Sequence, residues 1–420
     1  MIVRPIGFLL LTAIFALPVT VRAQQDPNDL QLIDIIPVPG NPLLSADIGW
    51  VDPATQRYYL ANRSNLGVEI IDATTHAWVG RVGGMAGPLA SGGGTTSTNG
   101  PGPNGVLVTP DKILWAGDGN STVHVADVDP NSPEYLDILA SISTNISDCD
   151  DGTAHYCGRA DELGYDPRDR IILIANNAPL SVTAPHGPIA PYATFISADP
   201  PYAILGTISF VGAGGLEQPL WDGATQRFYL TVPGSSSSGV LPFVAVIDAV
   251  NMTVEKTFAF DCQKLVGNNS TSATGIALGQ NDTLLVSACG QPILMNAVTG
   301  NIINVVDQVG GGDEVWYNPG DDRFYVTAAD AQTGVQSLGM IDGTSANWLL
   351  NVADVRGRNP AALPDNNHIF TLVAVTPGIV ADPSTDDSTC TLFGLRGRGC
   401  VAVFGHPVAP ASARLGKPPQ

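Results

Sequence analysis

A two-strand pattern repeats along this chain, and it restricts the fold more than any other feature. In its strong form, a short apolar strand ends in a turn of Asp, Pro or Gly, and an aromatic and β-branched strand that begins with Arg follows, which is the signature of a β-hairpin. The strong copies are 47–53 with 57–62, 160–167 with 170–176, 216–222 with 227–231, and 313–319 with 323–327. Weaker copies begin at Asn104, Thr274 and Asn359, so the pattern occurs seven times.

A third strand that ends in a small polar turn follows every copy. Its members are 68–73, 123–128, 194–199, 244–249, 293–297, 338–343 and 400–405. Several short strands repeated every roughly 40–60 residues are typical of a β-propeller. We therefore predict an all-β fold, a single closed propeller of seven four-stranded blades, with six or eight blades as alternatives.

The last copy lacks an outer strand, whereas the beginning of the chain has a spare one at 30–38. We expect this N-terminal strand to complete the last blade and close the ring, because an open sheet edge promotes aggregation. The predicted domain runs over residues 24–408, and 409–420 are expected to form a flexible C-terminal tail.

The first residues have the pattern of an export signal. Arg4 is followed by an apolar stretch, 8–19, and by small residues around Ala23 that suit cleavage. We predict a signal peptide over 1–23 and a secreted protein, extracellular or, in a Gram-negative host, periplasmic.

The six cysteines fit such a compartment, because disulfides persist where the environment is oxidising. Six cysteines allow about 15 connectivities, and the nearest-neighbour set is Cys149–Cys157, Cys262–Cys289 and Cys390–Cys400. The Asn-x-Ser/Thr sequons also predict a glycoprotein if the host glycosylates; they include Asn62, Asn120, Asn145, Asn251 and Asn281.

The formal net charge of −20 makes nucleic acid and anionic membranes poor partners. We expect a monomer that binds a small-molecule substrate or an extracellular ligand. The same acidity attracts cations, although it also serves simply to keep an exported protein soluble.

One position near the start of each inner strand is polar in every blade. The seven residues are Asp47, Asn104, Asp161, Glu217, Thr274, Asp313 and Asn359, with Arg358 as an alternative for the last. Because all inner strands of a propeller run the same way, these positions should form a ring at one mouth of the channel. Glu162 and Glu314 come one residue later.

Four carboxylates at close range oppose one another's ionisation, and a divalent cation is the simplest compensation. Oxygen ligands favour Ca²⁺, with Mg²⁺, Mn²⁺ and Zn²⁺ as alternatives. The competing interpretation is that the ring residues cap the inner strands by binding backbone groups.

Two segments resemble the SMP-30/gluconolactonase family: Glu217–Asp222, similar to its Glu-Gly-Pro-x-Trp-Asp motif, and Pro103–Asp111, similar to its Pro-Asn-Gly…Ser-Pro-Asp segment. Gln218 and Glu314 stand where that family has Gly. The resemblance implies metal ligands Glu217, Asn104 and Asp313, to which the ring adds Asp47. The repeat also resembles YVTN-type propellers, many of which are binding modules.

A metal-bound water would need a general base within reach. The candidates are Asp161, Glu162 and His155. We expect His186, Asn359 and Glu314 to contact substrate. The other histidines (His76, His124, His368, His406) are expected to be packing or surface residues. The aromatic repeat residues (Trp50, Tyr165, Trp221, Trp316, Tyr317) are expected to form core between the blades rather than a sugar-stacking platform.

Two functions follow. The first is a metal-dependent, lactonase-like hydrolase of lactones or related small carbonyl compounds. The alternative is a non-catalytic extracellular propeller that binds a protein or glycan ligand. A propeller fold supports many functions and does not decide between them.

Overall fold

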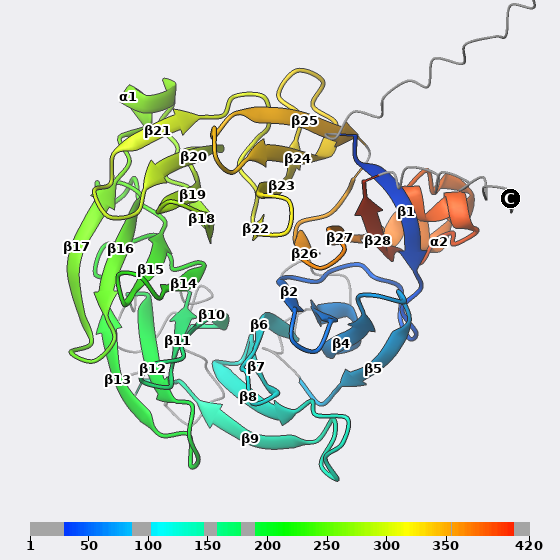
Figure 1. Ribbon diagram of the computed structural model, residues 1–420, viewed down its shortest axis with the longest axis horizontal. Helices are drawn as coiled ribbons and strands as arrows, with labels where there is room; N and C mark the ends of the chain where they lie inside the picture. Colours follow the sequence, from blue (N-terminus) through cyan, green and yellow to red (C-terminus); the bar gives the residue numbers. More distant parts are fainter. Residues whose placement is uncertain (1–28, 86–101, 147–157, 178–189, 354, 407–420) are drawn as a thin grey trace, which may run out of the picture.

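The protein forms seven four-stranded antiparallel sheets arranged as blades around a central channel (Figure 1). The computed structural model describes residues 29–85, 102–146, 158–177, 190–353 and 355–406. The chain is therefore a seven-bladed β-propeller, and the predicted fold class is confirmed. The predicted signal peptide, 1–23, and tail, 409–420, lie outside the described residues.

Six blades are each built from four consecutive strands that run from the channel outward. The first three are β2(Gly49–Asp52), β3(Arg57–Asn62), β4(Gly67–Asp72) and β5(Trp78–Val82); β6(Pro103–Val108), β7(Ile113–Asp118), β8(Thr122–Asp127) and β9(Ile138–Ser143); and β10(Ala160–Asp166), β11(Ile171–Asn176), β12(Tyr192–Ser197) and β13(Ile204–Ser209). The next three are β14(Pro219–Asp222), β15(Arg227–Val232), β16(Phe243–Asp248) and β17(Thr253–Ala259); β18(Ala273–Leu278), β19(Thr283–Ala288), β20(Gln291–Asn296) and β21(Ile302–Val305); and β22(Val315–Asn318), β23(Arg323–Ala329), β24(Gln336–Asp342) and β25(Trp348–Ala353).

The seventh blade joins the two ends of the chain. Its inner strands are β26(Ala361–Leu363), β27(His368–Val373) and β28(Cys400–Gly405), and its outer strand is β1(Gln31–Ile36). β1 pairs antiparallel with β28, with Ile36 opposite Val401, and the two lie side by side in Figure 1. The predicted closure by an N-terminal strand is confirmed, and it leaves no unpaired β28 edge.

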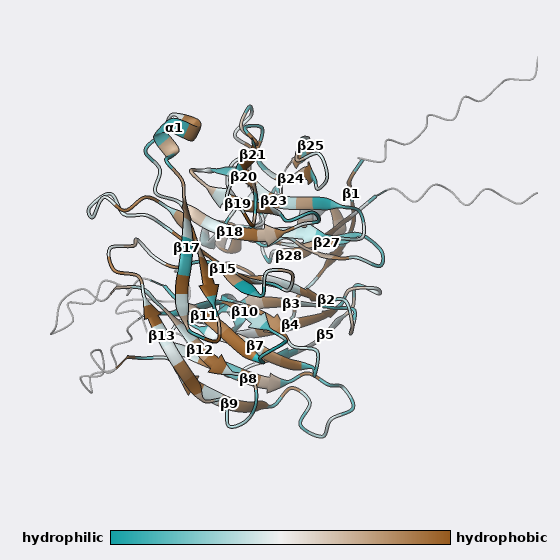
Figure 2. Ribbon diagram, turned by 60° about the vertical axis from the view of Figure 1, so that its left-hand side comes forward, coloured by the Kyte–Doolittle hydropathy of each residue, from teal (hydrophilic) through white to brown (hydrophobic). Residues whose placement is uncertain are grey.

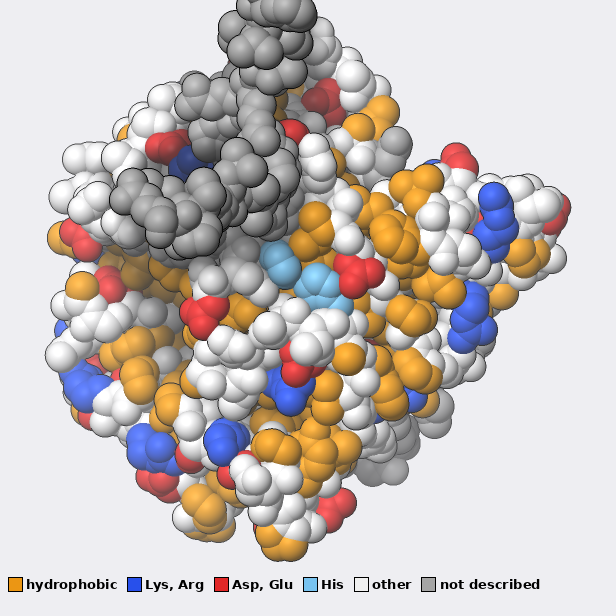
Figure 3. Space-filling view, turned by 45° about the vertical axis from the view of Figure 1, so that its right-hand side comes forward, with side chains coloured by type: hydrophobic (Ala, Val, Ile, Leu, Met, Phe, Trp, Pro, Cys, Tyr) orange, Lys and Arg blue, Asp and Glu red, His pale blue; other side chains and the backbone are white. Residues whose placement is uncertain are grey.

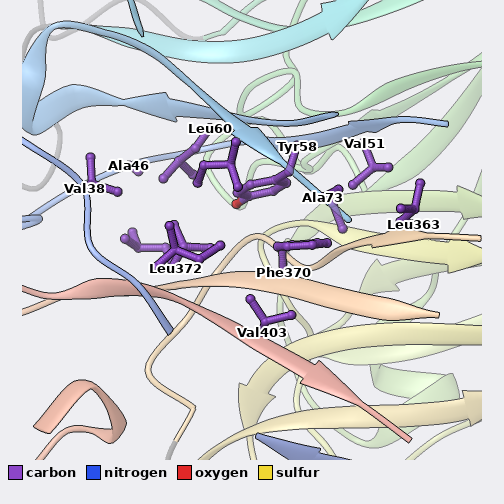
Figure 4. Packing of buried hydrophobic residues seen from close by; sticks show 14 of the residues in the cluster. Val38, Ala46, Val51, Tyr58, Leu60, Ala73, Leu363, Phe370, Leu372 and Val403 are labelled. Carbon is purple, nitrogen blue, oxygen red and sulfur yellow. The ribbon is translucent and has the colours of Figure 1, made fainter. Parts of the chain in front are cut away.

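Burial explains why the middle strands are almost continuously apolar. Each blade packs on both faces against its neighbours, so residues 58–62 of β3 are all buried, whereas the outer strand β9 alternates between more and less exposed positions. Figure 2 shows apolar colour along many of these strands. At the closing seam, the rings of Tyr58 and Phe370 stack with centroids 5.1 Å apart within a shared core (Figure 4).

Short helical segments and two disulfides complete the described structure. α1(Cys262–Val266) contributes Cys262 to the Cys262–Cys289 bond, and an insertion with α2(Pro377–Ala381), η3(Pro383–Thr385) and η4(Thr389–Phe393) carries the Cys390–Cys400 bond. The predicted presence of disulfides is confirmed, and both bonds belong to the nearest-neighbour set among the connectivities that the sequence left open; Cys149–Cys157 lies outside the described residues. No helix in the described part of the chain is long and apolar enough to cross a membrane.

Candidate functional site

The polar ring predicted from the repeat lies at the start of the inner strands. In β6, β10 and β18, the pairing with the next strand shifts register directly after the first residue, so Asn104, Asp161 and Thr274 fall within a β-bulge. A bulge redirects side chains and interrupts pairing. In β2, β14, β22 and β26, the ring residue lies just before the strand. The ring residues therefore occupy one end of the channel.

Hydrogen bonds at these positions connect each blade to the next. Asn177 Nδ2, which follows β11, bridges Asp161 Oδ2 and Glu217 Oε1 at 3.0 Å each. The other links are Ile48 N to Asn104 O, Asn104 Nδ2 to Ala160 O, Thr231 Oγ1 to Thr274 O, Thr274 Oγ1 to Gly312 O, Glu314 N to Arg358 O, and Asn359 Nδ2 to Asp47 O. The ring thus acts as a hydrogen-bonded belt, in agreement with the strand-capping interpretation.

Two guanidinium groups compensate the carboxylates of the belt. Arg63, in η1(Arg63–Asn65), is only 5% exposed; it donates from Nε to Asn104 Oδ1 at 2.9 Å and forms an ion pair with Asp47. Arg159 donates from Nε to Asp161 Oδ2 at 2.7 Å. Burial by itself would lower the pKa of Arg159, but the carboxylates of Asp161, Asp47 and Glu217 raise it above its ordinary value.

Neither arginine was recognised from the sequence. Arg159 directly precedes an inner strand, and Arg63 follows the second strand of its blade at a place where the other blades have no arginine. That departure from the repeat is the only feature of the sequence that marks Arg63 as unusual. Nothing in the sequence shows that Arg63 contacts a ring residue of another blade.

The ring residues do not fit a divalent metal as they stand. Asn104 accepts from Arg63, Glu217 accepts from Asn177, and Asp313 pairs with Arg358 at 3.5 Å. Across the described ranges, no group of three or more His, Cys, Asp or Glu side chains is arranged to hold a metal ion. A guanidinium group beside these oxygen atoms would also repel a metal cation.

Burial perturbs the titration of the ring acids. It raises the pKa of Asp47 to about 6, against the lowering effect of Arg63 and with a further increase from Asp161. Burial and Asp161 also raise the pKa of Glu217 well above its usual range. Asp313, by contrast, is 43% exposed and lines an open hollow of about 460 Å³ on the outer side of the ring.

A second layer of polar side chains lies one residue further into the channel. Glu314 Oε2 accepts from Gly49 N at 2.9 Å, and Gln218 Oε1 accepts from Ile276 N at 2.8 Å. Glu162 is 5% exposed, and its Oε2 has no hydrogen-bond partner among the residues placed by the structure. Burial, followed by the charges of Asp161 and Glu217, raises the pKa of Glu162 well above its usual range.

Beyond this layer the channel widens into a cavity of about 470 Å³. Inner-strand residues of six blades line it, and most are apolar; the polar ones are Glu162 and Gln218 at the ring end. Three tryptophans, Trp50, Trp221 and Trp316, form part of the wall. Trp50 and Trp316 meet edge to face with centroids 5.5 Å apart, and Trp50 Nε1 is buried without a partner in the described structure.

These tryptophans were predicted to pack between blades. In the structure they do so, and they also form part of the cavity wall. The rings of Trp221 and Phe228 have centroids 5.0 Å apart, and Trp316 packs against two of the hydrophobic clusters between blades. Each is nevertheless only partly buried, because its other side faces the cavity.

Among the predicted residues that the structure describes, Asn359 is not part of the cavity wall. Asn359 is fully buried, and its Oδ1 accepts from Leu372 N at 2.9 Å while its amide binds Asp47 O, so both polar ends are used by the backbone. His155 and His186 lie outside the described residues. The sequon residue Asn62 is also fully buried and caps η1, which removes it as a glycan acceptor.

The other histidines belong to hydrogen-bonded contacts, as expected. His124 is bonded to Ser141 and Asp118 within one blade. His76 lies between Asp34 and His368, at 2.8 and 2.9 Å, across the closing seam. Figure 3 shows two histidine side chains side by side at the surface.

Comparisons with known proteins support the fold alone. No family model and no curated protein matches the chain. A chain in a solved structure described as "Crystal Structure of Mitotic Checkpoint Complex" is similar, with a TM-score of 0.52 and 16% sequence identity over 89% of this chain and 96% of that chain. Membership of the SMP-30/gluconolactonase family is not confirmed.

Proposed function

We propose that this propeller is a binding protein that takes a small ligand with an apolar body into its central channel. The observation that carries the proposal is the cavity of about 470 Å³ along the channel, lined by aromatic and aliphatic side chains. Small-molecule sites are typically apolar hollows of roughly 300–1,000 Å³ with a few polar groups. The cavity has this size and composition.

Binding is favoured over metal-dependent hydrolysis by the pairing of the ring residues. The lactonase-like mechanism needs oxygen ligands that are free for a cation, whereas Asn104 and Asp47 are bound to Arg63. A glycan is a weaker candidate than an apolar molecule, since the cavity wall has few groups that could bind sugar hydroxyls.

We also propose that the protein works outside the cytoplasm, as the predicted export signal implies. The Cys262–Cys289 and Cys390–Cys400 bonds support this proposal, because such bonds persist in oxidising compartments.

Fluorescence titration with the uncharged apolar dye N-phenyl-1-naphthylamine tests the binding function. We expect saturable enhancement with one dye per chain. Leu220→Trp should weaken binding at least about tenfold, because Leu220 lines the cavity and the larger ring would fill it. The matched control is Leu392→Trp, at a residue that is 74% exposed and does not line the cavity.

Unchanged melting temperatures would show that both variants fold. Absence of saturable binding, or equal weakening by the two substitutions, would overturn the proposed function.

A further inference from the structure

We infer that the channel selects a cationic ligand, a molecule with an ammonium head that lies against Glu162 and an apolar body that lies among Trp50, Trp221 and Trp316. This inference rests on the proposed function and adds the charge and chemical class of the ligand.

Glu162 is the acidic residue of the cavity wall and lies at the ring end, beside the ring residue Asp161. It lines the cavity wall, is 5% exposed, and its Oε2 atom lacks a partner in the part of the chain that the structure describes. Buried polar atoms are nearly always hydrogen-bonded, so an unpaired one at the end of a cavity points to a ligand.

Several other acidic groups lie around Glu162. Those that act on it come from four blades: Asp161 on its own strand, and Glu217, Glu314 and Asp47 at the starts of other inner strands. The guanidinium groups of Arg63 and Arg159 are bound to Asp47 and Asp161. Because these two carboxylates already have cationic partners, Glu162 is the acid that is left to attract a positive charge and to repel a negative one.

This environment keeps the proton on Glu162 when the channel holds no cation, since burial and the neighbouring acids raise its pKa. When an ammonium group binds, the carboxyl group releases its proton to solvent and the carboxylate pairs with the cation. The bound ammonium group thus replaces the proton of Glu162. Because a lower pH favours the protonated carboxyl group, acid should weaken binding of the cation.

The walls suit the same ligand. Aromatic side chains offer large apolar surfaces that pack well against the apolar part of a ligand. Trp50, Trp221 and Trp316 line this otherwise apolar space. The net charge of −20 also attracts cations to the protein from a distance.

A matched pair of probes tests the inference. Benzyltrimethylammonium and neopentylbenzene have nearly the same shape and differ by one positive charge. Each is used to displace N-phenyl-1-naphthylamine from the full chain at pH 7.5 and pH 5. At pH 7.5 we expect benzyltrimethylammonium to displace the dye at a concentration at least about tenfold lower than neopentylbenzene does. At pH 5 the ratio of the two concentrations should be smaller.

Glu162→Gln should bring the ratio of the two affinities close to one, whereas Glu134→Gln, the same substitution at an exposed site, should leave it unchanged. Equal displacement by the two probes, or no displacement by either from a channel that binds the dye, would overturn the cationic inference alone. Failure of the dye itself to bind would overturn the proposed function and this inference together.

Discussion

Replacing Glu162 by Gln should stabilise the protein at neutral pH and leave its stability almost unchanged in acid. In the unfolded chain the carboxyl titrates near its ordinary pKa of 4.5, whereas burial and the neighbouring Asp161 and Glu217 raise the pKa in the folded protein. Between these values the folded state binds a proton that the unfolded state has released, so this group makes stability fall as the pH rises.

The pH interval limits the size of the effect. If Glu162 stays protonated at pH 7, the folded state keeps a proton that the unfolded state releases above its ordinary pKa of 4.5, which lowers the free energy of unfolding by at most about 3 kcal/mol. Gln has the same shape and no proton to take up. The free energy of unfolding of Glu162→Gln should exceed that of the wild type by up to this amount at pH 7, with a melting temperature about 4 °C higher. At pH 4 the difference should nearly vanish.

Guanidinium unfolding and thermal melts at pH 4 and pH 7 measure this difference. Asp47, Glu217 and Glu314 have raised pKa values too and add a slope of the same sign, so the variant is compared with the wild type at each pH. Glu134→Gln, at the surface, is the control. The reasoning is refuted if Glu162→Gln is less stable than the wild type at pH 7, or if the two differ equally at both pH values.

Three further predictions concern the belt, the disulfides and the closing strand. Arg63→Ala leaves Asp47 buried without its cation and should lower the free energy of unfolding by about 3–5 kcal/mol. Arg168→Ala, in an exposed pair with Asp169, should cost far less, and similar losses for the two variants in denaturant titrations would contradict the structural role of Arg63. Replacing Cys262 and Cys289 together by Ser opens a loop of 27 residues and should lower stability by about 2–4 kcal/mol, with an unchanged transition midpoint as the opposing result. Removing residues 29–36 deletes β1 and exposes the β28 edge, so light scattering should show concentration-dependent aggregation; a monodisperse product with a native melt would argue against closure by β1.

The sequence alone was sufficient for the fold because the repeat is local. Each hairpin carries its own turn residues and strand periodicity, so the strands could be located one blade at a time. Counting them left one outer strand missing at the end and one spare at the beginning, which predicted the pairing of β1 with β28. The ring position followed in the same way, since equivalent residues of the repeat must lie at the same end of the channel.

Only the tertiary structure decided what the ring does. Arg63 meets Asn104 from another blade, 41 residues away, and Glu314 binds Gly49 across 265 residues. Such contacts depend on how the blades are placed around the axis, which no local pattern encodes. The same is true of the tryptophans: the periodicity of a strand shows that one face of Trp50 or Trp316 is buried, but the cavity on the other side exists only after seven inner strands have closed into a ring.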